Sequence, residues 1–297
     1  MENNDNTSYD YLCEKQLRKT DPRLHLRFRS SVFAMDYLLA NYKNVFPFYT
    51  NHTYEHSEQV IRYCNVIAGE KIIESLTPDE IYILLMSASL HDVGMGVSEA
   101  DFKRFYPSVP ELCDYMEQNP GKPTAEYMRE FHQVLSAQFV RKYCALFEIP
   151  SEDHIECICR VVRGHRRADL LDRSKYPTDY SLSNGSKVNL AYLSALVKLA
   201  DELDITSDRN LFFDYSKQNE EWSAEQTMCY KCHGAIKKLA AEENQLTLFY
   251  ETDDPAVEEE ILQKCRSVEK VFSEYRAVVN ERTDFACRIQ KITFEKI

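Results

Sequence analysis

The chain has 297 residues, of which 44% are hydrophobic and 28% are charged, and its formal net charge is −12 at pH 7. This length and composition are typical of a globular protein whose core forms without disulfides or structural metals. The negative charge argues against a protein whose main partner is duplex DNA or an anionic membrane, because both repel an acidic surface.

The sequence also indicates in which cellular compartment the protein is expected. The first ten residues are polar and acidic, unlike a secretory leader. No run of about eighteen apolar residues is present, so no membrane-spanning segment is expected. There are ten cysteines, several of them on helical patterns, where a reduced thiol packs as a small hydrophobe. We therefore expect a protein of the reducing cytoplasm.

Helical periodicity predicts helices over residues 30–48 and 54–70 in the first part of the chain. The next helix has a clear start, because the motif TPDE at residues 77–80 is a capping box with proline at the first helical position. Gly94 and Gly96 are expected to end this helix.

Three further helices are predicted before residue 210. One covers residues 124–147, a second begins at a cap on Ser151, and a third begins at a cap on Ser186. The stretch 165–187 lacks periodicity and is rich in turn formers and charges, so we expect a long surface loop there, close to the functional site.

After about residue 210 the pattern changes. Residues 245–250 (QLTLFY) alternate and are rich in strand formers, and residues 289–294 look similar. Between them, residues 255–282 have helical periodicity. We expect a small antiparallel sheet with this helix packed on it, so the fold class is mainly α with a C-terminal α+β part.

Polar side chains able to bind metal lie in register with the apolar faces of five predicted helices. A buried charge without a partner costs several kcal/mol, so five helices with such a residue need a common partner. One such histidine alone is more often a hydrogen-bonded core residue, but the joint pattern favours a divalent cation. The six residues are His56, His91, Asp92, His132, His165 and Asp201.

The donor set narrows the choice of metal. Imidazole nitrogens and carboxylate oxygens suit Mn, Fe, Co, Ni or Zn better than Ca, and Mg is a further candidate. The sequence is compatible with one or two ions per chain. His52 is expected to lie outside the site, although its closeness to His56 leaves its role open.

The order of these residues resembles a known family. His56 is followed by SLHDVG at residues 89–94 and by KLADELD at residues 198–204, which is similar to the HD superfamily of metal-dependent phosphohydrolases. The resemblance covers about residues 50–210. It implies that His56, His91, Asp92 and Asp201 coordinate one metal. It also places His132 and His165 where dinuclear members supply two further histidines.

Three segments resemble a subgroup, the HD variety found in bacterial conflict and stress proteins. They are FHQVLSA at residues 131–137, RGHR at residues 163–166 and LADELDIT at residues 199–206. The C-terminal sheet and helix also fit this subgroup. The resemblance therefore implies an HD-domain helical bundle over residues 1–210, with its core at about 50–210. Residues 211–297 are expected to form an α+β extension packed on it.

The sequence departs from the family at one position. Many HD enzymes carry a lysine three residues after the paired aspartate, where this chain has Met95. Lys198, one helical turn before Asp201, is the candidate to supply that positive charge in catalysis. Asp92 is expected to bridge two metals, because the residue beside His91 can reach both, and to orient a metal-activated water or accept its proton.

Phosphate groups need cations near the metals. Residues 160–175 form the most basic stretch of the chain and adjoin His165. Arginine matches phosphate oxygens with two-point contacts, so we expect Arg163, Arg166 and Arg167 to bind substrate. The alternative is a solvated helix end, where basic side chains favour the helix dipole.

These observations favour a hydrolase that cleaves a small phosphomonoester or phosphodiester, with a nucleotide or signalling nucleotide as the expected substrate. A single-strand nuclease is the alternative among enzymes. A non-catalytic sensor of metal or nucleotide is the alternative from another class, and a purely structural helical adaptor is a third reading. An oligomer is compatible with the sequence, which does not give the oligomeric state.

Overall fold

Helices in this protein begin where side chains cap their free N–H groups. In the computed structural model, which describes residues 12–46, 50, 52–207 and 222–297, Thr77 accepts from the backbone N–H of Glu80 and starts α6, Pro78–Leu90. Ser151 caps α10, Glu152–Gly164, as predicted. The cap of α11, Leu190–Leu203, is Asn189. The prediction at Ser186 is wrong because the short strand β2, Lys187–Val188, separates Ser186 from the helix.

Each of the remaining α-helices also buries at least one side chain in the core. The predicted helix 30–48 is two helices, since α2 ends at Leu39, and the predicted helix 124–147 ends at Lys142. The helices are α1 (Leu12–Thr20), α2 (Pro22–Leu39), α3 (Tyr42–Val45), α4 (Tyr54–Ala68), α5 (Glu70–Ser75), α7 (Glu99–Phe105), α8 (Pro110–Gln118), α9 (Thr124–Lys142), α13 (Ala224–Ala235) and α14 (Pro255–Arg282).

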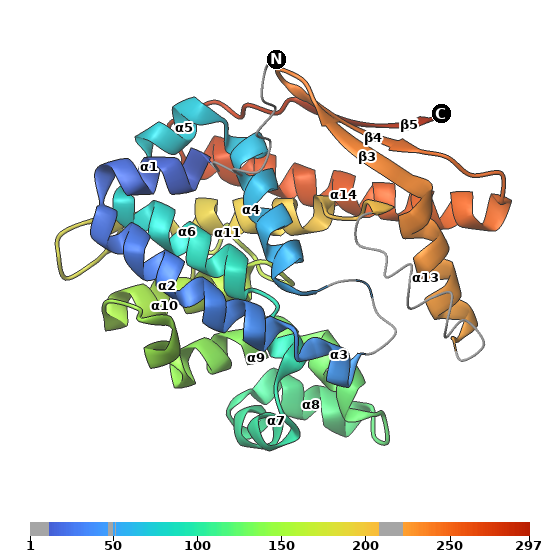
Figure 1. The fold of residues 1–297 in the computed structure, drawn as a ribbon, viewed down its shortest axis with the longest axis horizontal. Helices are drawn as coiled ribbons and strands as arrows, with labels where there is room; N and C mark the ends of the chain where they lie inside the picture. Colours follow the sequence, from blue (N-terminus) through green and yellow to red (C-terminus); the bar gives the residue numbers. More distant parts are fainter. Residues whose placement is uncertain (1–11, 47–49, 51, 208–221) are drawn as a thin grey trace, which may run out of the picture.

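Helix α11 lies at the centre of the molecule. It packs against α4 and α10 on the side of the bundle and against α14 on the other side. Nearly all of its residues are buried, as expected for a helix with apolar side chains on most faces. In Figure 1, α14 runs across the molecule between the helical bundle and the sheet. The helix that carries Asp201 is therefore held from several sides.

The C-terminal sheet has three strands in the order β3 (Ile236–Ala241), β4 (Gln245–Tyr250) and β5 (Lys291–Lys296). Strands β3 and β4 are antiparallel, but β5 pairs parallel to β4. The prediction of an antiparallel sheet is thus correct for one pair and wrong for the other. The reason is the connection, because α14 is a crossover helix that returns the chain to the starting end of β4.

The segment between α10 and α11 is mostly irregular, as predicted, apart from the two-residue strands β1 (Tyr180–Ser181) and β2. Arg282, at the end of α14, is buried and donates to the carbonyl oxygens of Leu171 and Tyr176 at 2.8 and 2.6 Å. The C-terminal region thus fixes the loop beside the bundle. The predicted domain boundary at residue 210 lies outside the described residues, so the division stays a prediction.

The structure also bears on the predictions of reduced cysteines and of no membrane-spanning segment. All ten cysteines are free thiols in the structure. Among the described helices, none alone has the length and apolar composition needed to cross a membrane. Within the described residues, one pair of segments, Pro78–Gly96 and Glu99–Ser108, meets that test together, and the two are bent by 106° at their junction.

Candidate metal centre

Helix ends bring the six predicted ligands together. His56 lies in the first turn of α4, and His91 and His165 directly follow the last residues of α6 and α10. Asp201 lies in the last turn of α11. His132 follows Phe131, whose φ of −120° and ψ of 19° break α9. Because side chains at helix ends are free of the neighbouring turn on one side, several helices can direct polar groups to one point.

The first group contains His56, His91, Asp92 and Asp201, whose ligand atoms lie within 4.8 Å of one another. The Nε2 atoms of His56 and His91 are 3.1 Å apart. The Nε2 of His56 is 3.2 Å from Asp201 Oδ1 and 3.4 Å from Asp92 Oδ2. Two imidazoles and two carboxylates therefore converge on one small buried volume.

The second group contains Asp92, His132 and His165. The Nε2 atoms of the two histidines are 3.0 Å apart. They lie 3.3 and 3.9 Å from Asp92 Oδ1, whereas Asp92 Oδ2 faces His56 and His91. The single carboxylate of Asp92 thus stands between both groups, with one oxygen directed to each.

The hydrogen bonds of the Nδ1 atoms determine which imidazole nitrogens are available to bind a metal. The Nδ1 of His56 donates to Asp204 Oδ2 at 2.5 Å, and the Nδ1 atoms of the other three donate to backbone carbonyls. Each inward Nε2 then carries a lone pair in the neutral form. In each pair the two Nε2 atoms are only 3.0 to 3.1 Å apart. Because their lone pairs repel each other, a proton or a cation is needed between them. This donor set fits divalent transition metals.

Two residues near the groups were not predicted as part of the site. Asp204 is buried and holds the Nδ1 of His56, an outer contact that typically sets the orientation of a metal-binding imidazole. His52, which we expected to lie outside, places its Nε2 3.8 Å from Asp92 Oδ2. Asp204 lies about one turn after Asp201 at the end of α11, and this spacing could have indicated its role. The four-residue spacing of His52 from His56 was the corresponding signal for His52.

The buried charges shift one another strongly. Burial lowers the pKa of His91, but Asp92 and Asp201 outweigh burial and raise that pKa well above its usual value. Burial raises the pKa of Asp92, yet His91 and His56 hold it well below the usual range. Burial, together with His91 and His132, lowers the pKa of His165 well below the usual value. These shifts favour a proton on His91 in the first group and disfavour one in the second group, where a cation is the remaining partner for the facing Nε2 atoms.

Metal affinity is expected to rise with pH. A metal at the first group must displace the proton that the carboxylates hold on His91, so affinity weakens by about tenfold for each pH unit below that raised pKa. In the metal-free protein, the pairing of protonated His91 with Asp92 and Asp201 also stabilises the fold. This stabilisation is fully present below the pKa of histidine in the unfolded chain, about 6.5, and is lost as pH rises through the raised pKa of His91 in the folded protein. Chelator-competition titrations between about pH 6 and 8.5 measure the affinity. A pH-independent affinity would contradict a protonated His91.

The other predicted residues lie around the centre. The ammonium of Lys198 pairs with Glu274 of α14 at 2.7 Å, which gives it a partner outside both groups. Arg163 donates to Glu111 at 3.0 Å, and Arg167 pairs with Glu130. Arg166 contributes to the lowered pKa of His132, after burial as the main cause. The catalytic role of Lys198 and the substrate contacts of the three arginines stay predictions.

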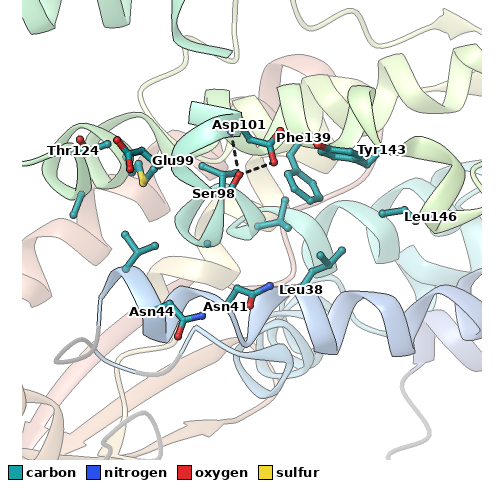
Figure 2. Close-up of a pocket in the computed structure, with 16 residues that line it drawn as sticks. Leu38, Asn41, Asn44, Ser98, Glu99, Asp101, Thr124, Phe139, Tyr143 and Leu146 are labelled. Carbon is teal, nitrogen blue, oxygen red and sulfur yellow. Dashed lines mark hydrogen bonds between the residues drawn. The ribbon is translucent and has the colours of Figure 1, made fainter. Parts of the chain in front are cut away.

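An apolar pocket of about 770 Å³ lies beyond the turn η1 (Val93–Gly96) that follows Asp92. Figure 2 shows Asn41 and Asn44 on one wall and Ser98, Glu99 and Asp101 on the other. The backbone N–H of Asp101 donates to Ser98 Oγ at 3.1 Å, which closes the turn at the start of α7. None of the described residues that line this pocket is one of the six ligands, so the pocket is separate from the metal centre.

Comparison with known proteins bears on the whole site. No curated protein is similar enough to the chain to count as a match. The family model HD-CE, in contrast, matches residues 46–280, which include all six ligands and most of α14. This match confirms the resemblance to HD proteins, and the buried His and Asp groups are compatible with an HD-type metal site. The chain belongs to the HD-CE family.

Proposed function

We propose that this protein is a metal-dependent phosphohydrolase that cleaves a small phosphomonoester or phosphodiester, such as a nucleotide. The observation that carries the proposal is the position of Asp92, with Oδ2 directed to His56 and His91 and Oδ1 directed to His132 and His165. Such an arrangement suits two ions held close together, as in enzymes that stabilise both oxygens of a phosphoryl displacement.

Charge supports a phosphate substrate. The two groups contain two carboxylates, those of Asp92 and Asp201, and four imidazoles. With Asp204 beside His56, three carboxylates face the four positive charges of two divalent cations, which leaves an excess of one positive charge. A buried excess of positive charge favours an anionic substrate over a neutral one. The charge count thus favours an anionic substrate, and a phosphoester is one.

Each side chain has a distinct task in this proposal. A bound divalent ion lowers the pKa of water and polarises phosphoryl oxygen. Asp92 keeps its two oxygens fixed between the imidazole pairs, and Asp204 keeps the His56 ring in the orientation that points Nε2 inward. Arg166 follows His165 and is the predicted cation for a phosphate beside His132.

A non-catalytic sensor is the second candidate, and one observation favours it. Met95 occupies the position of the lysine that many HD enzymes carry, and it is buried. Lys198, the predicted replacement, pairs with Glu274. A site that binds metal and ligand but lacks this cation fits recognition without turnover.

The test compares wild type with Asp201→Ala, both purified without chelator. We expect about two transition-metal ions per wild-type chain by mass spectrometry, and loss of metal from the first group in the variant. Wild type, supplied with Mn, Fe, Co, Ni, Zn or Mg, is expected to hydrolyse bis-p-nitrophenyl phosphate or p-nitrophenyl phosphate, and Asp201→Ala is expected to be inactive. Glu202→Ala is the matched control, because it removes a neighbouring carboxylate of α11 that belongs to neither group.

The outcomes separate the candidates. Metal without turnover of either ester or of a nucleotide panel would favour the sensor. About one ion per chain would reassign His132 and His165 to substrate contacts. Turnover of single-stranded oligonucleotides only would favour the nuclease. No metal in either protein after reconstitution would overturn the proposal and leave a structural adaptor.

A further inference from the structure

A second pocket, separate from the metal centre, lies on the outer side of α9 and α10. It has a volume of about 740 Å³, which is within the usual range for small-molecule sites. Its walls come from α9, from α10 and from the segment between residues 166 and 176. Of the described residues that line it, none is one of the six metal ligands.

The two sites use different faces of the same helices. Gln133, Ala137 and Arg141 line the pocket at the four-residue spacing of one face of α9. His132 is on the face of α9 that approaches Asp92. On α10, Glu156, Arg160 and Arg163 line the pocket at the same kind of spacing. A ligand in the pocket would therefore lie behind the metal-binding imidazoles and not between them.

The pocket gathers positive charge in an acidic protein. Six of its lining residues are cationic and three are acidic, in a chain whose net charge is −12. The cations are Arg141, Arg160, Arg163, Arg166, Arg167 and Lys175. The acidic residues are Glu111, Glu156 and Asp169. Such a concentration of guanidinium groups around a cavity suits the oxygens of phosphate.

The existing ion pairs do not close the pocket to an anion. Five of the six cations already have carboxylate partners: Arg163 pairs with Glu111, Arg141 with Glu152 and Glu156, Arg160 with Glu156, Arg167 with Glu130, and Lys175 with Asp172. The side chains of these cations are between 32% and 76% exposed. Exposed ion pairs contribute little stability, because water competes for both partners. A phosphate, which offers several oxygens at once, can replace them.

The uncharged part of the pocket wall indicates which other chemical groups the ligand has. Phe131, Val134, Ala137 and Tyr176 give the pocket uncharged surface beside the cations. Sites for small organic ligands combine such surface with a few charged groups. The pocket thus matches a molecule with an apolar part and phosphate groups, whereas a bare inorganic anion would leave the uncharged wall unused.

The basic segment is held in place before any ligand binds. Arg282 donates to the carbonyls of Leu171 and Tyr176, and Arg160 donates to the carbonyl of Lys175 at 3.1 Å. Arg167 has a φ of 49°, in the left-handed region that is unfavourable for a residue with a Cβ. Strained backbone of this kind is found at ligand sites when surrounding contacts enforce it.

We propose that this pocket is a second ligand site, which binds an organic phosphate of nucleotide size independently of the metal centre. Arg141, Arg160 and Lys175 bind the phosphates, and the wall formed by Phe131 and Tyr176 contacts the organic part. This site does not depend on hydrolysis, so it stands or falls separately from the proposed function.

The test is calorimetric titration of the full chain with pyrophosphate and with adenosine diphosphate, at fixed ionic strength. Wild type is expected to bind the diphosphate nucleotide more tightly than pyrophosphate. The double variant Arg141→Gln/Lys175→Gln is expected to bind both at least about tenfold more weakly, since each lost charge-assisted contact weakens binding by about that factor. Asp201→Ala removes a ligand of the metal centre and is expected to lose only binding at the metals, so the binding that remains, at this pocket, keeps an affinity for both within about twofold of wild type.

A matched control removes the same charge elsewhere. Lys103→Gln/Lys122→Gln changes two exposed lysines that do not line the pocket, and it is expected to bind like wild type. Equal losses in this control and in the pocket variant would show general charge attraction and overturn the proposal. Loss of binding in Asp201→Ala with retention in the pocket variant would place the ligand at the metals. Absence of binding to wild type would also overturn it.

Discussion

Asp92→Asn is expected to empty both ligand groups of metal and to lower phosphoester hydrolysis by about a thousandfold. The substitution keeps the shape of the side chain but removes the charge that stands between the two imidazole pairs. Without it, four imidazoles and Asp201 remain, so only one carboxylate ligand is left for two divalent cations. Metal analysis by mass spectrometry and a steady-state assay with bis-p-nitrophenyl phosphate measure the two effects.

Two matched variants make this result specific. Asp204→Asn weakens the hold on His56 without removing a ligand, and it is expected to lower metal affinity by about 10- to 100-fold. Glu202→Gln lies between the two aspartates in sequence and is expected to behave like wild type. Asp92→Asn with full metal content at both groups would contradict the bridging position. Thermal melting of each variant separates loss of metal from loss of fold.

Gly94→Ala is expected to destabilise the protein by about 3 kcal/mol and to release the second ligand group. A Cβ at Gly94 would lie 2.4 Å from the carbonyl oxygen of His132 and 2.6 Å from the backbone nitrogen of Ser136. Both are backbone atoms of α9, so a side-chain rotation cannot relieve the clash. Moving α9 away would carry His132 from Asp92, which now lies at 3.3 Å.

The measurement is a thermal melt combined with metal analysis. Gly185→Ala is the control, because a Cβ there meets nothing within 4 Å and only the positive φ of 88° opposes it. It is expected to cost about 1 kcal/mol and to leave the metal content unchanged. A Gly94→Ala protein with the melting temperature of wild type and two ions per chain would show that α9 yields easily at this point.

The grouping of the six candidate ligands could be predicted from sequence because burial of a polar group is costly wherever it occurs. His56, His132 and Asp201 each continue an apolar helical stripe, so the sequence already marks them as groups that need an inner partner. The structure brings all six predicted ligands into two adjoining groups. Helices with strong start signals, such as the one at Thr77, were predictable because a capping box satisfies free N–H groups with side chains that are close in sequence.

Features that depend on how distant segments meet were not predictable. The hydrogen bond from His56 to Asp204 joins residues 148 positions apart. The parallel pairing of β5 depends on where the chain returns after α14, which no local pattern encodes. Short helices such as α7 and α8 have too few turns for a clear period and were not predicted. Lys198 was assigned from helical spacing alone, which could not reveal Glu274 on α14 as its partner.

The parallel strand β5 also has a bearing on solubility. Strand β4 has the sequence QLTLFY, and four of its six residues are buried, including Leu246 and Leu248. With β3 on one side and β5 on the other, both of its hydrogen-bonding edges are covered. A β-prone apolar strand with an open edge is a template for pairing between chains. Strand β5 therefore protects this edge of β4 from pairing with another chain.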